Sequence, residues 1–221
     1  MYLRNVLLAA IATSIVAFAQ TPVTADAPFQ VRYAANLNLG ESYINITNTG
    51  ANGASILGPG FGAQAGNICV NVYAFDPAEE LIACCSCLVT PDQTVSLGVN
   101  RDLTVKTLTG AQPPSVTVKL LATLAGPNGS LSGNVCNNSA ANVGATTTGV
   151  PGLAAWGTTL HATPVAGTVA TTETAFTPST LSAGEAASIG GRCASILGNG
   201  SGFGICNSCR AGALGAKPVA Q

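Results

Sequence analysis

Charged residues are scarce in this chain of 221 residues, which has eight lysines and arginines and nine aspartates and glutamates. They make up 8% of the sequence and leave a net charge of -1, whereas roughly 25% is usual in a soluble domain. A nucleic-acid-binding surface needs clustered cations that displace counterions from phosphates. The cations of this chain are few and dispersed, so a nucleic-acid-binding surface is excluded. Disorder of the charged type requires low hydrophobicity, yet 47% of the residues are hydrophobic. We therefore expect a folded protein without a nucleic-acid partner.

Recognisable catalytic motifs are also missing. The one histidine, His161, lies in an apparent strand, and the sequence has no serine nucleophile elbow, phosphate loop, dinucleotide fingerprint or haem-attachment motif. Members of a Ser/His/acid triad need not be adjacent, but a half-buried structural histidine is the simpler interpretation. The clustered acids Asp76, Glu79 and Glu80 are interpreted as the solvated tip of a hairpin. We expect no catalytic residue and no cofactor, and a secreted enzyme is the third functional hypothesis.

The first 19 residues resemble a secretory signal. Arg4 precedes an uncharged apolar run at residues 6–19, which ends in the small residues Ala17 and Ala19. The alternative is a transmembrane anchor, but the run is shorter than the about 20 residues that span a bilayer. We therefore expect a signal that is cleaved before Gln20. No later stretch is long and apolar enough for a membrane span. The mature chain is expected to be secreted, at the cell surface or in the periplasm.

An even number of cysteines in an exported chain favours disulfides. All eight follow the expected cleavage site: Cys69, Cys84, Cys85, Cys87, Cys136, Cys193, Cys206 and Cys209. The group of Cys84, Cys85 and Cys87, together with Cys206 and Cys209, is also a candidate thiolate set for zinc or an iron–sulfur cluster. Oxidation after export opposes that interpretation, and we expect no metal site.

The rest of the chain predicts a mainly β protein. After an extended lead at residues 20–30, short segments of alternating polarity are bounded by Gly, Asn, Asp or Pro. The expected strands are at residues 30–38, 42–48, 68–75, 80–89, 94–100, 103–108, 115–124, 152–164 and 168–178. Such a series is typical of an antiparallel β-sandwich of about seven or more strands.

A single domain is expected over residues 31–198, with a long loop without periodicity at residues 126–152. One helix is expected at about residues 183–198, because a capping-box pattern starts at Ser182. A Cys-rich C-terminal loop and tail follow at residues 199–221.

The first long hairpin suggests one disulfide. If Phe75 lies opposite Leu81, the register places Cys69 opposite Cys87, at a Cβ separation that suits a disulfide. We therefore expect a Cys69–Cys87 bridge, with Cys69–Cys85 as the alternative one step away.

The other cysteines are assigned by face. Cys84 would point to the opposite face of its strand, where Cys136 is the expected partner. Cys193 falls on the core face of the expected helix, just before the C-terminal cysteines. It is expected to pair with Cys206 or Cys209.

Several blocks of the chain resemble a set of uncharacterised secreted bacterial proteins. The blocks are ANLNLGESYINITNTGA, ICVNVYAFDPAEELIACCSC, GLAAWGTTLHATP, ETAFTPSTLSAGE and GSGFGICNSCR, in this order. The CCSC and CNSCR parts are the most specific. The resemblance covers most of the mature chain and implies an exported, cysteine-containing bacterial domain, and it carries over no activity and no site residue.

Two non-enzymatic functions fit these features. The first is a structural or adhesive protein of the cell surface or matrix, which self-associates because charge repulsion is weak and Thr-rich strand edges can extend a neighbouring sheet. The second is a secreted module that binds a glycan or small ligand with the 126–152 loop and Trp156 as a stacking platform. A core position is the simpler interpretation of Trp156.

Overall fold

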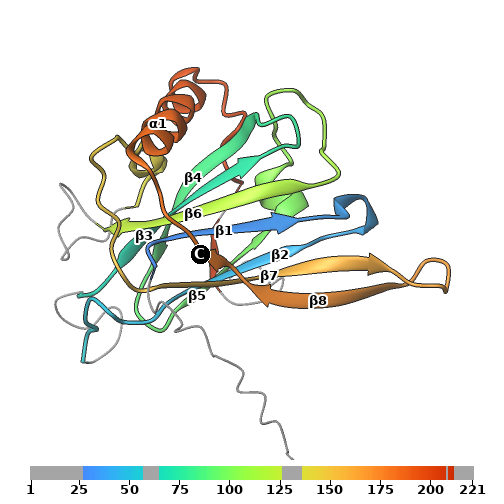
Figure 1. Cartoon of the computed structure of the whole chain (residues 1–221), viewed down its shortest axis with the longest axis horizontal. Coiled ribbons are helices and arrows are strands. Elements are labelled where there is room, and N and C mark those ends of the chain that lie inside the picture. Colours follow the sequence, from blue (N-terminus) through green and yellow to red (C-terminus); the bar gives the residue numbers. More distant parts are fainter. Residues whose placement is uncertain (1–26, 57–64, 126–135, 208, 212–221) are drawn as a thin grey trace, which may run out of the picture.

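The computed structural model describes residues 27–56, 65–125, 136–207 and 209–211. The strands in these ranges are β1 (Phe29–Ala34), β2 (Tyr43–Asn48), β3 (Ile68–Phe75), β4 (Leu81–Val89), β5 (Thr94–Gly98), β6 (Val116–Leu124), β7 (Leu153–Ala162), β8 (Val169–Ala175), β9 (Thr177–Pro178) and β10 (Arg210–Ala211), and the α-helix is α1 (Ala183–Gly198). Sheet I has the order β4-β3-β6-β1-β9, and sheet II has the order β10-β5-β2-β7-β8. All of these pairings are antiparallel. The predicted mainly β sandwich with one C-terminal helix is confirmed (Figure 1).

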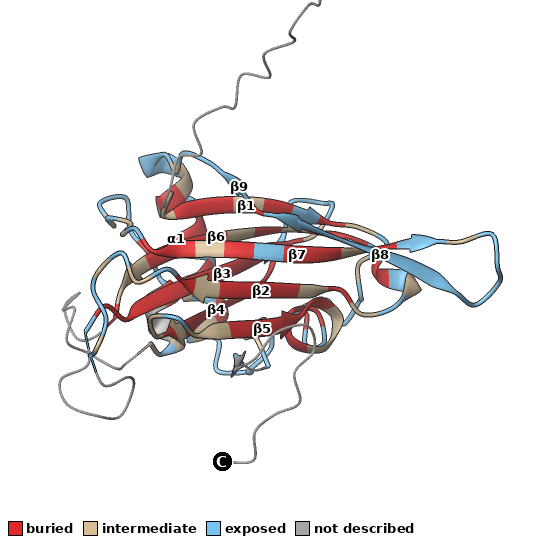
Figure 2. Ribbon diagram, turned by 90° about the horizontal axis from the view of Figure 1, so that it is seen from below, coloured by how far each residue is buried: buried red, intermediate tan, exposed pale blue. Residues whose placement is uncertain are grey.

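The main hydrophobic core lies between the two sheets. Ile44 and Ile46 of β2 and Val70 and Val72 of β3 belong to this core, and their side chains are almost completely buried. Residues of one face recur at every second position, which is the alternation seen in the sequence. Burial of both faces of β3 shows that a further layer covers sheet I (Figure 2).

Helix α1 forms that layer, together with the short 3₁₀ helix η4 (Asn138–Ala141). Ile189 of α1 and Tyr73 of β3 belong to a second buried cluster between the helix and sheet I. The hydroxyl of Ser182 accepts a hydrogen bond from the backbone N–H of Glu185 at 3.1 Å, so the predicted N-cap is present.

The strand predicted at residues 103–108 does not form. A single π-helical turn, η2 (Val99–Leu103), follows β5, and the buried carboxylate of Asp102 accepts a hydrogen bond from the Gly98 N–H at 2.7 Å. Residues 104–108 after this turn pair with no described strand, and Val105 is half exposed. The alternation in this segment therefore does not reflect a paired strand.

A β-bulge in the β3–β4 hairpin overturns the predicted disulfide register. Phe75 does lie opposite Leu81, but Ala74 lies opposite Ala83, so Ile82 is an extra residue in β4. Beyond the bulge Cys69 faces Leu88 instead of Cys87. A shift of one residue moves a side chain to the other face of the sheet, so neither Cys69–Cys87 nor Cys69–Cys85 forms.

All eight cysteines form disulfides, but none of the bonds is one of the predicted pairs. The bonds are Cys69–Cys136, Cys84–Cys193, Cys85–Cys206 and Cys87–Cys209. The expected Cys84–Cys136 bridge is wrong because α1 covers the outer face at Cys84. Pairing of Cys193 with Cys206 or Cys209 is wrong for the same reason, since those two cysteines reach the inner face of β4. Cys193 does face the core, as expected.

Some expectations fall on residues that the structure does not describe. The predicted signal at residues 1–19 lies outside the described residues, as do the first ten residues of the 126–152 loop. In the described ranges, no helix has the length and apolar character to cross a membrane.

Candidate functional site

The C-terminal segment closes one side of the sandwich. The Cys84 N–H donates to the Gly204 carbonyl at 2.8 Å, so the segment lies along the outer edge of β4. A few residues later β10 pairs with β5 of sheet II. The disulfides Cys85–Cys206 and Cys87–Cys209 fasten this crossing to the inner face of β4. The segment therefore joins the two sheets and covers the edge of sheet I.

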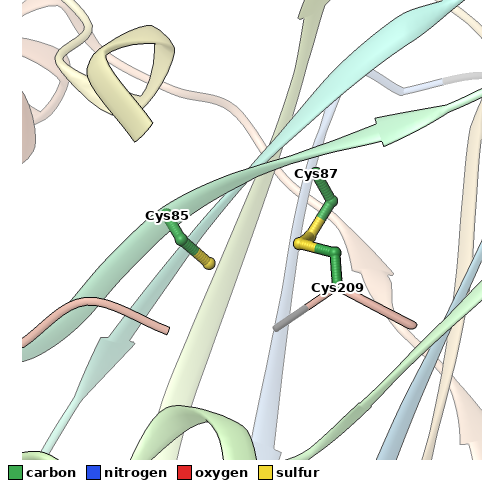
Figure 3. Close-up of side chains that lie close together, drawn as sticks. All are labelled: Cys85, Cys87 and Cys209. Atoms are coloured by element: carbon green, nitrogen blue, oxygen red, sulfur yellow. A yellow bond between two sulfur atoms is a disulfide. The ribbon is translucent and has the colours of Figure 1, made fainter. Parts of the chain in front are cut away.

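These two disulfides bring together four of the five cysteines considered as metal ligands. The sulfur atoms of Cys85, Cys87 and Cys209 lie within 4.8 Å of one another (Figure 3). Each of them is already bonded to another sulfur, so none is a thiolate, which is the form that binds zinc. Cys84, the fifth cysteine, faces α1 on the opposite side of the strand. These cysteines therefore serve as disulfides that fasten the C-terminal segment to β4.

Polar side chains join the sheets on the opposite side of the sandwich. Arg32 of β1 is only 8% exposed, and its guanidinium donates to the Thr158 carbonyl and to the hydroxyls of Thr159 and Thr174. A methyl group on Gly157 would lie 2.5 Å from Arg32 Nη1, so the guanidinium packs directly on the glycine backbone. Burial lowers the pKa of Arg32, and the charge of nearby Glu173 opposes this shift.

The strands held by Arg32 extend into a projecting hairpin. We call β7, β8 and the connecting residues 163–168 the arm; its distal part extends beyond the rest of the sandwich (Figures 1 and 2). All seven residues of β8 are exposed. Asn45 of β2 donates to the Glu173 carboxylate at 2.9 Å, and Thr172 hydrogen-bonds His161 at 2.9 Å. Polar contacts thus hold β8 in place, while its own residues stay exposed.

The free edge of β8 presents alternate backbone groups to solvent. The Phe176 N–H donates to the Ala155 carbonyl at 2.9 Å, which makes these opposed residues a hydrogen-bonded pair. Hydrogen-bonded and non-hydrogen-bonded pairs alternate along an antiparallel ladder. The backbone groups of even-numbered β8 residues therefore face β7. Those of the odd-numbered residues point outward, namely Val169, Thr171, Glu173 and Ala175.

The other sheet edges in the described residues are short or covered. The C-terminal segment lies against β4, while β9 and β10 contain two residues each. Pro178 also lacks an N–H on the β9 edge. Strand β8 has seven residues and pairs with β7 on one side. No described residue pairs with its other side, which is therefore a long open edge.

Trp156 lies on the arm and not in the core. It is 41% exposed on the outer face of sheet II, opposite Asn45 on β2. The η4 part of the 126–152 loop packs on β4 and α1, outside sheet I. In the described residues, η4 and Trp156 therefore lie on opposite faces of the sandwich and do not form one platform.

The remaining candidate catalytic groups are not assembled. In the described part of the chain, the ring of His161 has a hydrogen bond to Thr172 and no acidic partner. Asp76 accepts hydrogen bonds from the N–H groups of Ala78 and Glu80, both at 2.9 Å, within an exposed turn. The interpretation of Asp76, Glu79 and Glu80 as a hairpin tip agrees with this geometry.

A groove that sequence reasoning missed lies between α1 and the β3–β4 hairpin. Its volume is about 600 Å³, and Leu81, Leu108 and Ile196 supply apolar walls. Arg192 donates to the Glu79 carbonyl at 2.7 Å and lines the rim without an ion pair among the described residues. The full lining comprises Glu80, Leu81, Ile82, Leu108, Thr109, Arg192, Ser195, Ile196 and Asn199.

The Arg32 contact was also missed, although the sequence contains a signal for it. Gly157 interrupts an otherwise regular strand, and glycine in a strand often marks close approach of another group. The groove has no such signal, since its walls come from three separate segments. No family model, curated protein or solved structure matches the chain.

Proposed function

We propose that the protein is an exported structural or adhesive protein that self-associates through the free edge of its arm. The observation that carries this proposal is the uncovered β8 strand, which presents seven exposed residues at the edge of sheet II. Unpaired N–H and C=O groups on a strand edge can pair with another chain. The arm carries the distal part of this edge beyond the body of the molecule, where a second chain can reach it (Figure 2).

The composition of β8 supports pairing. Natural proteins protect edge strands with lysine, proline or strong bends, but β8 reads VATTETA and contains only one charged residue, Glu173. Its valine and threonines favour strand structure. The net charge of -1 for the whole chain gives little repulsion between copies.

The disulfides support an extracellular setting. Four disulfides connect the sandwich, its helix and its C-terminal segment, and such bonds persist in oxidising compartments. Cross-linked domains also suit a structural role, because a disulfide restricts the unfolded chain and resists unfolding.

Sedimentation velocity over a wide concentration range tests the proposal. We expect the wild-type protein to sediment faster as its concentration rises. Thr171→Pro removes an outward N–H but leaves the ladder between β7 and β8 intact, so it should weaken association. Thr171→Val keeps the N–H and serves as the matched control. A wild-type protein that remains monomeric at every concentration would contradict the proposal.

The groove favours a second candidate function, the binding of a small amphipathic ligand. Its apolar walls and the guanidinium of Arg192 suit a ligand with an apolar body and an anionic group. Anilinonaphthalene sulfonate has both features and fluoresces when bound to apolar surface.

Two groove variants and one control test this candidate. We expect Arg192→Ala and Leu108→Glu to reduce probe binding. Val105 is as exposed as Leu108 but does not line the groove, so Val105→Glu should leave binding unchanged. Equal fluorescence from all of these variants would argue against a site in the groove.

A further inference from the structure

We infer that two copies of the protein pair through β8 in an antiparallel, two-fold arrangement centred on Thr172. This inference rests on the proposed function, since it specifies the geometry of the same edge. When two identical strands pair in an antiparallel two-fold arrangement, both copies use the same surface. No further copy can then be added at this edge, so the assembly is a dimer.

Backbone direction limits the registers that are available. Only the odd-numbered residues of β8 have outward N–H and C=O groups. An outward residue must therefore oppose an outward residue of the second copy. Registers in which odd-numbered residues face even-numbered ones are excluded, because they would leave these groups unpaired.

Centring on Thr172 uses the full length of the strand. Val169 then opposes Ala175 of the second copy, and Thr171 opposes Glu173, with the same two pairs repeated by symmetry. Each such pair exchanges two hydrogen bonds, so every outward N–H and C=O of both strands finds a partner. Any other permitted centre leaves part of β8 without a partner.

Charge favours the same register. A centre at Glu173 would place two carboxylates directly opposite each other, and so would parallel pairing of equivalent residues. Opposed like charges on a sheet are destabilising. With the centre at Thr172, each Glu173 faces a threonine and keeps its hydrogen bond from Asn45.

The exposed apolar residues of the arm also fit this arrangement. Trp156 lies opposite Ala175 on the outer face of sheet II, and both Trp156 and Val169 are more than two-fifths exposed. In the dimer, Val169 of the second copy lies on the other side of Ala175, about 10 Å from the Trp156 backbone. The indole ring of Trp156 can extend over the small Ala175 side chain to contact that valine. By symmetry, the same contact forms between Val169 of the first copy and Trp156 of the second.

Disulfide trapping tests the register. In the inferred dimer the two Thr172 residues oppose each other as a non-hydrogen-bonded pair, with Cα atoms about 4.5 Å apart, which a disulfide can bridge. Ala170 lies on the same face and is also exposed, but its two copies are about 14 Å apart along the strands. With copper–phenanthroline and dissolved oxygen as the oxidant, Thr172→Cys should become mostly covalent dimer on a non-reducing gel. Ala170→Cys, the matched control, should remain monomeric on the same gel.

The outcomes separate this inference from the proposed function. If the wild-type protein associates but Thr172→Cys is not trapped, or Ala170→Cys is trapped equally well, the two-fold register is overturned and self-association stands. If the wild-type protein does not associate in sedimentation and Thr172→Cys is not trapped, both the inference and the proposed self-association fail.

Discussion

The two C-terminal disulfides are expected to act as a coupled pair, and their removal tests the connectivity of the fold. Cys85–Cys206 and Cys87–Cys209 join residues that are 121 and 122 positions apart. Cys84–Cys193 already brings β4 to α1, however, so the chain left to be closed by either C-terminal bond is only about 15 to 20 residues. Once one of them has formed, the other closes a ring of about seven residues.

These effective loop lengths set the expected loss of stability. Loop-closure entropy gives about 3 kcal/mol for a 15-residue loop and about 2 kcal/mol for a seven-residue ring. Replacing either pair by alanine should therefore cost about 2 kcal/mol, and replacing both about 5 kcal/mol. Cys69–Cys136 spans 67 residues and is not shortened by the other bonds. Its loss should cost more, about 4 kcal/mol.

Guanidinium unfolding of the oxidised proteins measures these differences, with a thiol titration to verify that no other bond has opened. The predicted ranking is a larger loss for the Cys69–Cys136 pair than for either C-terminal pair. If each C-terminal bond acted across its full sequence separation, a single removal would cost about 5 kcal/mol. A measured loss of that size would refute the coupling of the two bonds through the seven-residue ring.

Three further changes probe the arm, the helix layer and the loop before β2. Gly157→Ala would place a methyl group 2.5 Å from Arg32 Nη1 and should destabilise the protein by about 1–3 kcal/mol in denaturant unfolding, whereas an unchanged midpoint would contradict this contact. Tyr73→Phe removes a buried hydrogen bond to the Ala141 carbonyl at 2.9 Å and should cost about 1–2 kcal/mol by the same assay; a neutral effect would argue against the bond. Burial raises the pKa of Glu41 above its ordinary value of 4.5, so the folded state holds this proton more tightly and stability should fall as pH rises from 4.5 through the raised pKa. Glu41→Gln should remove that part of the pH dependence of the unfolding midpoint, and an identical pH profile in both proteins would count against it.

Local patterns predict the elements of this fold well. The alternation at the start of β6 reflects its buried inner face, and the capping pattern at Ser182 marks the start of α1. The strand expected at residues 103–108 failed because the buried Asp102 carboxylate ends β5 in a π-helical turn. Such a contact depends on tertiary burial, which polarity patterns do not reveal.

The cysteine pairing could not be read from the sequence because one extra residue reverses the faces of a strand. The turn contact between Phe75 and Leu81 was predicted correctly, yet the bulge at Ile82 displaced every later pair by one position. The covering of sheet I by α1 then decided the partner of Cys84. Exposure of Trp156 likewise depends on which face of sheet II lacks a covering layer, and this is a property of the assembled fold.

Hydrogen exchange at β8 tests the central claim most directly. The amides of Thr172 and Thr174 face β7 and should be protected at any protein concentration. The amides of Thr171 and Glu173 face outward and should exchange quickly in dilute protein, then gain protection as the concentration rises and the edge becomes paired. Outward amides that exchange equally fast at every concentration would contradict assembly through this edge.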